Sequence, residues 1–310
     1  MTARIDILYL AKKSITVFLL CCCGSFIVAA QPLKLYHCMV DLDTLQKQGM
    51  QRQNILEAKL IDNRYIDPNK TGKVDSVSLT AAVIAHFPTA AEGGVGILDW
   101  EDNNHKAIQL IPNTGVKFED ALKQWITLLR IAKNLRPNVQ WGVYNLPYTS
   151  YWDRKEDWRT QADRMRPVYE MLDILMPSLY DFYPDGSAYT DEEAFFTDNT
   201  VLSLQIGTAF NKPVYAFIWQ RYHESNAKVG TELIPEHEFK QDIKYILSAS
   251  YNGTKVAGLV WFDAQTYFHY LKKDLKNTDA KMVGGPIENV DNKVLDVYSS
   301  YIKKQAARLR

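Results

Sequence analysis

Short apolar runs alternate along the chain with longer amphipathic stretches, and this alternation predicts strands and helices in turn. Runs rich in β-branched and aromatic residues are typical of buried strands. The predicted strands are Leu33–Val40, Ala58–Asp62, Val95–Trp100, Val139–Asn145, Ile174–Tyr180, Pro213–Trp219 and Val256–Phe262, and the pattern is weakest in Ala58–Asp62. Strands that each return through a helix indicate a mostly parallel sheet.

The amphipathic stretches predict the helices. Phe118–Leu135 has the clearest pattern, because Trp125, Ile126 and Leu129 fall on one face and Pro137 follows its end. The other predicted helices are Ser76–Phe87, Trp158–Leu172, Phe195–Phe210, Pro235–Ala249 and Lys293–Arg310.

The first predicted strand is not followed by a glycine-rich phosphate-binding loop, which argues against a nucleotide-binding open sheet. The pattern therefore predicts the α/β class, as a distorted TIM-like (β/α) barrel with seven or eight strands. We expect a single domain, with the barrel over residues 31–275 and a C-terminal helical extension over residues 276–310.

The N-terminus has the pattern of an export signal. Basic residues, among them Lys12 and Lys13, precede an uncharged run of 17 residues from Ser14 to Ala30, and small residues close that run. We expect a signal peptide over residues 1–30 and a secreted or periplasmic protein. The alternative is an uncleaved membrane anchor, although the run is at the short limit for spanning a bilayer. After signal removal we expect no stable membrane span.

Charge and cysteine content narrow the function. The chain has 36 basic and 36 acidic residues, and removal of residues 1–30 leaves 33 basic and 35 acidic. A nearly neutral protein is a poor candidate for binding nucleic acid. The mature chain keeps only Cys38, so it has no internal disulfide and is stabilised by its core.

Two carboxylic acids stand at the end of the third predicted strand. Asp99 and Glu101 follow apolar residues, at the C-terminal mouth where barrels of this kind keep their sites. Alternation along a strand places both side chains on one face, about 6.5 Å apart at the backbone. Crowding and desolvation separate the pKa values of such a pair, which suits division into acid and base roles. Glu101, nearer the rim, is the expected proton donor, and the alternative is a solvated or Lys106-paired strand end.

Aromatic and polar residues recur where other predicted strands end. Aromatic rings stack on the C–H faces of sugars, and polar neighbours bind the hydroxyl groups. The sequence therefore predicts a groove for a polysaccharide or oligosaccharide. Its candidate substrate-binding residues are Tyr144, Tyr180, Asp181, Trp219, Trp261 and Asp263.

The motifs that these residues belong to resemble the hyaluronidase family of glycoside hydrolases. Five pieces match in order at predicted strands, between about residues 90 and 265. They are Gly96-Ile-Leu-Asp99-Trp100-Glu101, Trp141-Gly142-Val-Tyr144-Asn-Leu-Pro147, Met176-Pro177-Ser178-Leu-Tyr180, Pro213-Val-Tyr215 and Gly258-Leu-Val-Trp261.

The resemblance implies a mechanism and roles for individual residues. It implies that Glu101 is the general acid/base and that Asp99 orients the N-acetyl group of a hexosamine, whose own oxygen attacks the anomeric carbon. Tyr180 and Trp261 would then surround that N-acetyl group. Such a substrate-assisted route retains configuration without a glycosyl-enzyme ester and uses neither metal nor cofactor.

The sequence also departs from the family. The family's disulfide cysteines are absent, Cys38–Asp43 differs from its usual substrate-contacting segment, and Trp219-Gln220 stands where a second pocket tyrosine is expected. The sequence therefore predicts a glycan substrate without selecting hyaluronan.

Two other functions stay open at this point. Asp41, Asp43, Asp99 and Glu101 form the candidate ligand set of a metal-dependent hydrolase, although the six histidines lack the spacing of common metal motifs. A barrel that binds glycans without cleaving them is the second alternative, because a site can lose its chemistry and keep its shape.

Overall fold

Seven parallel strands form the centre of the computed structural model, which describes residues 32–40, 42–154, 157–188 and 190–309. They are β1 (Lys34–His37), β2 (Ile55–Ile61), β3 (Gly94–Leu98), β4 (Val139–Tyr144), β5 (Ile174–Met176), β6 (Tyr215–Trp219) and β7 (Gly258–Phe262). All seven predicted strands are present. The predicted signal segment, residues 1–30, lies outside the described residues.

The strands form a nearly closed barrel. Their order is β5-β4-β3-β2-β1-β7-β6, and every ladder between neighbours is parallel. Isolated parallel bridges from Leu175 to Val214 and from Ser178 to Phe217 join the two ends of the sheet. The predicted TIM-like barrel is therefore confirmed, with seven strands.

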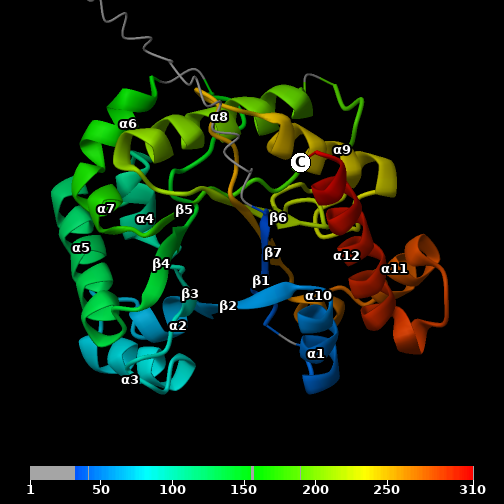
Figure 1. Cartoon of the computed structure of the whole chain (residues 1–310), viewed down its shortest axis with the longest axis horizontal. Helices are drawn as coiled ribbons and strands as arrows, with labels where there is room; N and C mark the ends of the chain where they lie inside the picture. Colours follow the sequence, from blue (N-terminus) through cyan, green and yellow to red (C-terminus); the bar gives the residue numbers. More distant parts are fainter. Residues whose placement is uncertain (1–31, 41, 155–156, 189, 310) are drawn as a thin grey trace, which may run out of the picture. The chain divides into compact units, whose positions relative to one another are not determined.

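Helices surround the strands (Figure 1). They are α1 (Thr44–Arg52), α2 (Asn63–Ile66), α3 (Ser76–His86), α4 (Asn103–Ile108), α5 (Phe118–Leu135), α6 (Trp158–Arg164), α7 (Arg166–Met171), α8 (Glu192–Phe210), α9 (Glu236–Ser248), α10 (Gln265–Leu271), α11 (Leu275–Val283), the 3₁₀ turn η1 (Ile287–Asn289) and α12 (Val290–Arg308). None of the helices within the described residues is both long and apolar enough to cross a membrane.

Aspartate caps start many of these helices. Asp75 accepts hydrogen bonds from the backbone N–H groups of Val77 and Ser78, each at 3.0 Å, and so satisfies two donors that the first turn of α3 leaves open. Asp191 caps α8 in the same way, accepting from Ala194 at 2.9 Å. For this reason α8 begins at Glu192, three residues before the predicted start at Phe195.

The predicted helix Trp158–Leu172 is instead two helices, α6 and α7, which meet at Met165. Pro167 lies in the first turn of α7, where its missing N–H costs nothing, but inside a continuous helix it would remove a hydrogen bond. The proline therefore explains the break.

Alternation along the strands builds two hydrophobic layers. On β3, Val95 and Ile97 face the barrel interior, whereas Leu98 and Trp100 pack between the sheet and the helices. Cys38, the last inward residue after β1, is 3% exposed. The alternation that turns Val95 and Ile97 inward continues past the end of β3. Asp99 therefore also faces inward, at the open end of the barrel.

The C-terminal segment is helical and packs on α9. The Tyr298 hydroxyl of α12 donates to the Ile234 carbonyl at 2.5 Å, and the Gln305 amide donates to Lys240 at 2.9 Å. Pro32–Arg310 forms one compact unit that includes α11 and α12.

Candidate functional site

A cavity of about 220 Å³ opens at the C-terminal end of the barrel. Five of the eight predicted site residues line it: Asp99, Glu101, Tyr144, Tyr180 and Trp219. The lining also includes Leu60, Phe217, His223, Glu224, Phe262 and Phe268, which sequence reasoning did not single out. The carboxylates and the aromatic residues predicted at separate strand ends therefore converge in one hollow.

A backbone hydrogen bond fixes Asp99 at the end of β3, and one of its carboxylate oxygens has no hydrogen-bond partner among the described residues. Its N–H donates to the Ile61 carbonyl at 2.9 Å, which continues the β2–β3 ladder by one residue. Its buried Oδ1 has no hydrogen-bond partner among the described residues. Burial, followed by the negative charges of Glu101 and Asp62, raises the pKa of Asp99 well above its usual range. Asp99 lines the cavity as well, so its carboxyl group is next to any molecule bound there.

Glu101 lies at the rim, where Asn63 fixes its backbone. The Glu101 N–H donates to Asn63 Oδ1 at 2.9 Å, and Asn63 Nδ2 lies 3.5 Å from the Glu101 carbonyl. Loss of hydration, followed by the negative charge of Glu224, raises the pKa of Glu101. A carboxylic acid that keeps its proton at higher pH and remains accessible to solvent is suited to general acid catalysis.

Glu101 also borders a second cavity, of about 490 Å³, on the side of α2. Its lining includes the polar residues Asn63, Arg64 and Lys70 and the apolar Trp100 and Val116. Glu101 therefore lies between the two cavities.

Aromatic side chains form the wall of the first cavity. Tyr144 and Tyr180 have ring centroids 6.0 Å apart, and the Tyr180 ring lies 5.5 Å from that of Trp219. The Tyr144 hydroxyl lies 3.1 Å from Ser178 Oγ. Burial raises the pKa of both tyrosines well above the usual range.

Asp263 supports this wall instead of lining it, which corrects its prediction as a substrate-binding residue. It is 2% exposed and accepts a hydrogen bond from Trp219 Nε1 at 3.1 Å. Gln220 donates to its other oxygen, and Arg221 Nε lies 3.4 Å from Oδ1. Asp263 thus orients the indole of Trp219 from behind.

Trp261 is also placed away from the cavity. It faces outward from β7, is 1% exposed, and donates through Nε1 to Gln220 Oε1 at 2.6 Å. The inward residue at this level is Phe262, because successive side chains of a strand alternate. The structure therefore places Trp261 behind the cavity wall, away from the position beside an N-acetyl group that the resemblance implies.

Asp181 also lies away from the cavity, although its neighbour Tyr180 lines it. Its side chain is 3% exposed, turns away from the cavity and accepts from the Tyr183 N–H at 3.0 Å. Its carbonyl accepts from the His223 N–H at 2.7 Å. Asp181 therefore anchors the loop that carries His223, and its carboxylate joins a separate acidic cluster beside α8 and α9.

The alternative metal centre at the barrel mouth does not assemble among the described residues. Asp43 caps α1, accepting from the Gln46 N–H at 2.8 Å, and borders a different cavity from Asp99 and Glu101. Asp41 lies outside the described residues.

Comparison with known proteins agrees with the motif pattern. No protein-family model matches the chain. A stretch of 95 residues is 30% identical to the hyaluronidase conohyal-Cn1 of Conus consors and covers 29% of this chain and 20% of the relative. The resemblance to hyaluronidases is confirmed. The match spans one fifth of that relative's length.

Solved structures agree with the fold. Bee venom hyaluronidase superposes with a TM-score of 0.57 at 15% identity, over 86% of this chain and 99% of the bee chain. The structure of bee venom hyaluronidase in complex with a hyaluronic acid tetramer superposes with a TM-score of 0.50 at 14% identity, over 80% of this chain and 98% of the bee chain. A Cellulomonas fimi endo-β-1,4-mannanase double mutant superposes with a TM-score of 0.51 at 10% identity, over 83% of this chain and 55% of the mannanase chain. At these identities the similarity concerns the barrel.

Proposed function

We propose that this chain is a glycoside hydrolase that uses Glu101 as general acid and base. The observation that carries the proposal is the convergence of Asp99 and Glu101 on one cavity with an aromatic wall. The partial match to a hyaluronidase and the barrel shared with a hyaluronidase and a mannanase support it. We further propose that the substrate contains N-acetylhexosamine and takes part in its own cleavage.

In the first step the sugar occupies the aromatic-walled cavity, and the leaving unit lies on the side of the second cavity. Glu101, whose raised pKa favours the protonated form, transfers its proton to the glycosidic oxygen as the C–O bond breaks. The carbonyl oxygen of the N-acetyl group attacks the anomeric carbon from the opposite face. The carboxyl group of Asp99, which lines the cavity, accepts the amide N–H and so holds the group in line.

In the second step Glu101, now a carboxylate, removes a proton from water as the water attacks the anomeric carbon. The ring formed with the N-acetyl group opens, and the sugar leaves with its configuration retained. Tyr144 and Tyr180 line the cavity in which both steps take place.

Replacement of Glu101 by Gln tests this proposal, because an amide fills the same space without a transferable proton. The purified protein is assayed on hyaluronan, chondroitin, chitin oligomers and peptidoglycan fragments. We expect turnover of one of them by the parent and a loss of about 10²–10⁴-fold in E101Q. Glu288→Gln, at an exposed residue of η1, is the matched control and should retain full activity.

Absence of turnover in the parent, together with glycan binding that E101Q leaves unchanged, would instead identify a glycan-binding barrel. Equal melting temperatures of the parent and E101Q show that a lost rate is not lost folding.

We also propose that the protein is exported, on the basis of the charged and apolar pattern of residues 1–30. N-terminal sequencing of protein recovered from outside the cytoplasm should begin at Gln31. An uncleaved N-terminus would contradict this.

A further inference from the structure

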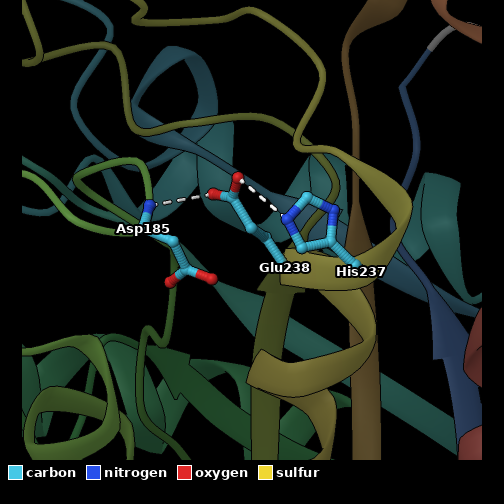
Figure 2. Close-up of side chains that lie close together, drawn as sticks. All are labelled: Asp185, His237 and Glu238. Carbon is cyan, nitrogen blue, oxygen red and sulfur yellow. Dashed lines mark hydrogen bonds and ion pairs between the residues drawn. The ribbon is translucent and has the colours of Figure 1, made fainter.

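A cluster of acidic residues lies beside the barrel, apart from the cavity. Its members come from the segment after β5 (Asp181, Asp185), the start of α8 (Glu192) and the first turns of α9 (Glu238, Asp242). Within the described residues, the ligand atoms of Asp185, His237 and Glu238 all lie within 4.8 Å of one another. Figure 2 shows the carboxylate of Glu238 between the other two residues.

Hydrogen bonds fix the central member of this group. Glu238 Oε2 accepts from the Tyr222 hydroxyl at 2.6 Å. It also accepts from the Asp185 N–H at 3.1 Å (Figure 2). Its other oxygen lies 3.7 Å from His237 Nε2. Asp185 and His237 are both exposed, so a solute can reach the group without rearrangement of the fold.

A buried carboxylate next to this group lacks a partner. Asp242 follows Glu238 by one helical turn and is only 6% exposed, yet its Oδ2 has no hydrogen-bond partner among the described residues. Its charged neighbours are Glu192, Asp185 and Glu238, all acidic. One oxygen of Glu192, itself 7% exposed, is equally without a partner.

Among the described residues, little positive charge reaches the buried side of the cluster. The guanidinium of Arg154 acts on Glu192, but it is also paired with Asp198 at 3.4 Å. Buried carboxylates are stable only when paired, protonated or bound to a metal ion. An imidazole beside two carboxylates is a mixed nitrogen and oxygen donor set, which suits Mn²⁺ or Zn²⁺.

We propose that Asp185, His237 and Glu238 bind a divalent transition-metal ion, Mn²⁺ or Zn²⁺, and that Asp242 supplies uncompensated negative charge behind it. The ion links the segment after β5 to α9. That segment begins next to Tyr180, and its Asp181 carbonyl holds the His223 N–H at 2.7 Å. Both Tyr180 and His223 line the cavity, so the ion stabilises one wall without taking part in the chemistry.

Calorimetric titration of the full protein tests the proposal. The protein is treated with a chelator, dialysed and titrated separately with MnCl₂, ZnCl₂ and CaCl₂. We expect saturable binding of one Mn²⁺ or Zn²⁺ per chain. At 100-fold excess over the dissociation constant, bound metal should raise the melting temperature by roughly 5 °C.

Variants assign the ligands. Asp185→Asn and His237→Gln change exposed side chains and should each weaken binding by about 10–100-fold. Asp242→Asn should weaken it as well by removing the buried charge. Glu288→Gln, an exposed acid outside the cluster, is the control and should leave the affinity unchanged.

Three results would overturn the proposal. The first is no saturable binding of any of the three ions, which would mean that protons neutralise the cluster. The second is binding that neither D185N nor H237Q weakens. The third is selective Ca²⁺ binding that H237Q leaves unchanged, because the imidazole would then have no role. None of these readouts depends on glycosidase activity.

Discussion

Two sets of carboxylates lie at the C-terminal ends of the barrel strands, and they differ in their partners. Asp263, after β7, is fully buried and pairs with Arg221, which in turn binds Asp279 at 2.8 Å. Asp99 and Glu101, after β3, form no ion pair with any described residue and face a cavity. A carboxylate with a counter-charge in the protein is structural, whereas one without it is available to a ligand.

The largest effect should come from breaking the paired set. Arg221→Met removes the guanidinium from the buried Asp263 and Asp279 and leaves Asp279 with His269 at 2.8 Å as its remaining partner. We expect the loss to lower the free energy of unfolding by about 3–5 kcal/mol. Urea denaturation measures this. Arg166→Met, which removes an exposed pair with Asp163, should cost about 1 kcal/mol or less. Equal decreases in the free energy of unfolding of the two variants would show that the buried ion pairs of Arg221 stabilise the protein no more than the exposed pair does.

Two tryptophan substitutions distinguish a residue that lines the cavity, Trp219, from one that packs behind it, Trp261. Trp219→Phe removes ring area and the hydrogen bond to Asp263, and we expect KM to rise about fivefold, from roughly 1 kcal/mol of lost contact. Trp261→Phe should leave KM unchanged and lower the free energy of unfolding by about 1 kcal/mol through the lost bond to Gln220. Steady-state kinetics and urea denaturation of both variants distinguish these outcomes, and a KM effect in Trp261→Phe alone would reverse the assignment.

The smallest expected effect is a change in the pKa of Glu101 when the nearby negative charge of Glu224 is removed. Glu224 raises the pKa of Glu101, so Glu224→Gln should lower it. The general acid must be protonated, and activity is therefore lost as pH rises through its pKa. We expect the alkaline limb of the kcat profile to move to lower pH in Glu224→Gln, with the maximal rate little changed. A shift to higher pH would contradict the role of Glu101 as the acid.

The sequence predicted the strands well because each is a short apolar run bounded by polar residues. It also predicted the shared face of Asp99 and Glu101, since both follow from alternation beyond one strand end. It could not place Trp261, because β7 (Gly258–Phe262) is apolar throughout. A strand without polar positions does not reveal which residues face inward.

Other members of the cavity depend on contacts far apart in the sequence. His223 and Glu224 belong to a segment after β6 that the Asp181 carbonyl holds in place. No local pattern marks such residues. By contrast, the missed helix α1 carried a readable signal, because Asp43 and Gln46 form a capping box at its start.

The buried position of Cys38 has a practical consequence for production of the protein. It is the only cysteine in residues 32–310, and it lies inside the barrel, where burial raises the pKa of its thiol well above the usual range. Formation of the barrel therefore includes no oxidation step, and its thiol resists alkylation and mixed-disulfide exchange. Residues 32–310 should reach the same folded state in a reducing cytoplasm and in an oxidising compartment, without assistance from disulfide-forming enzymes.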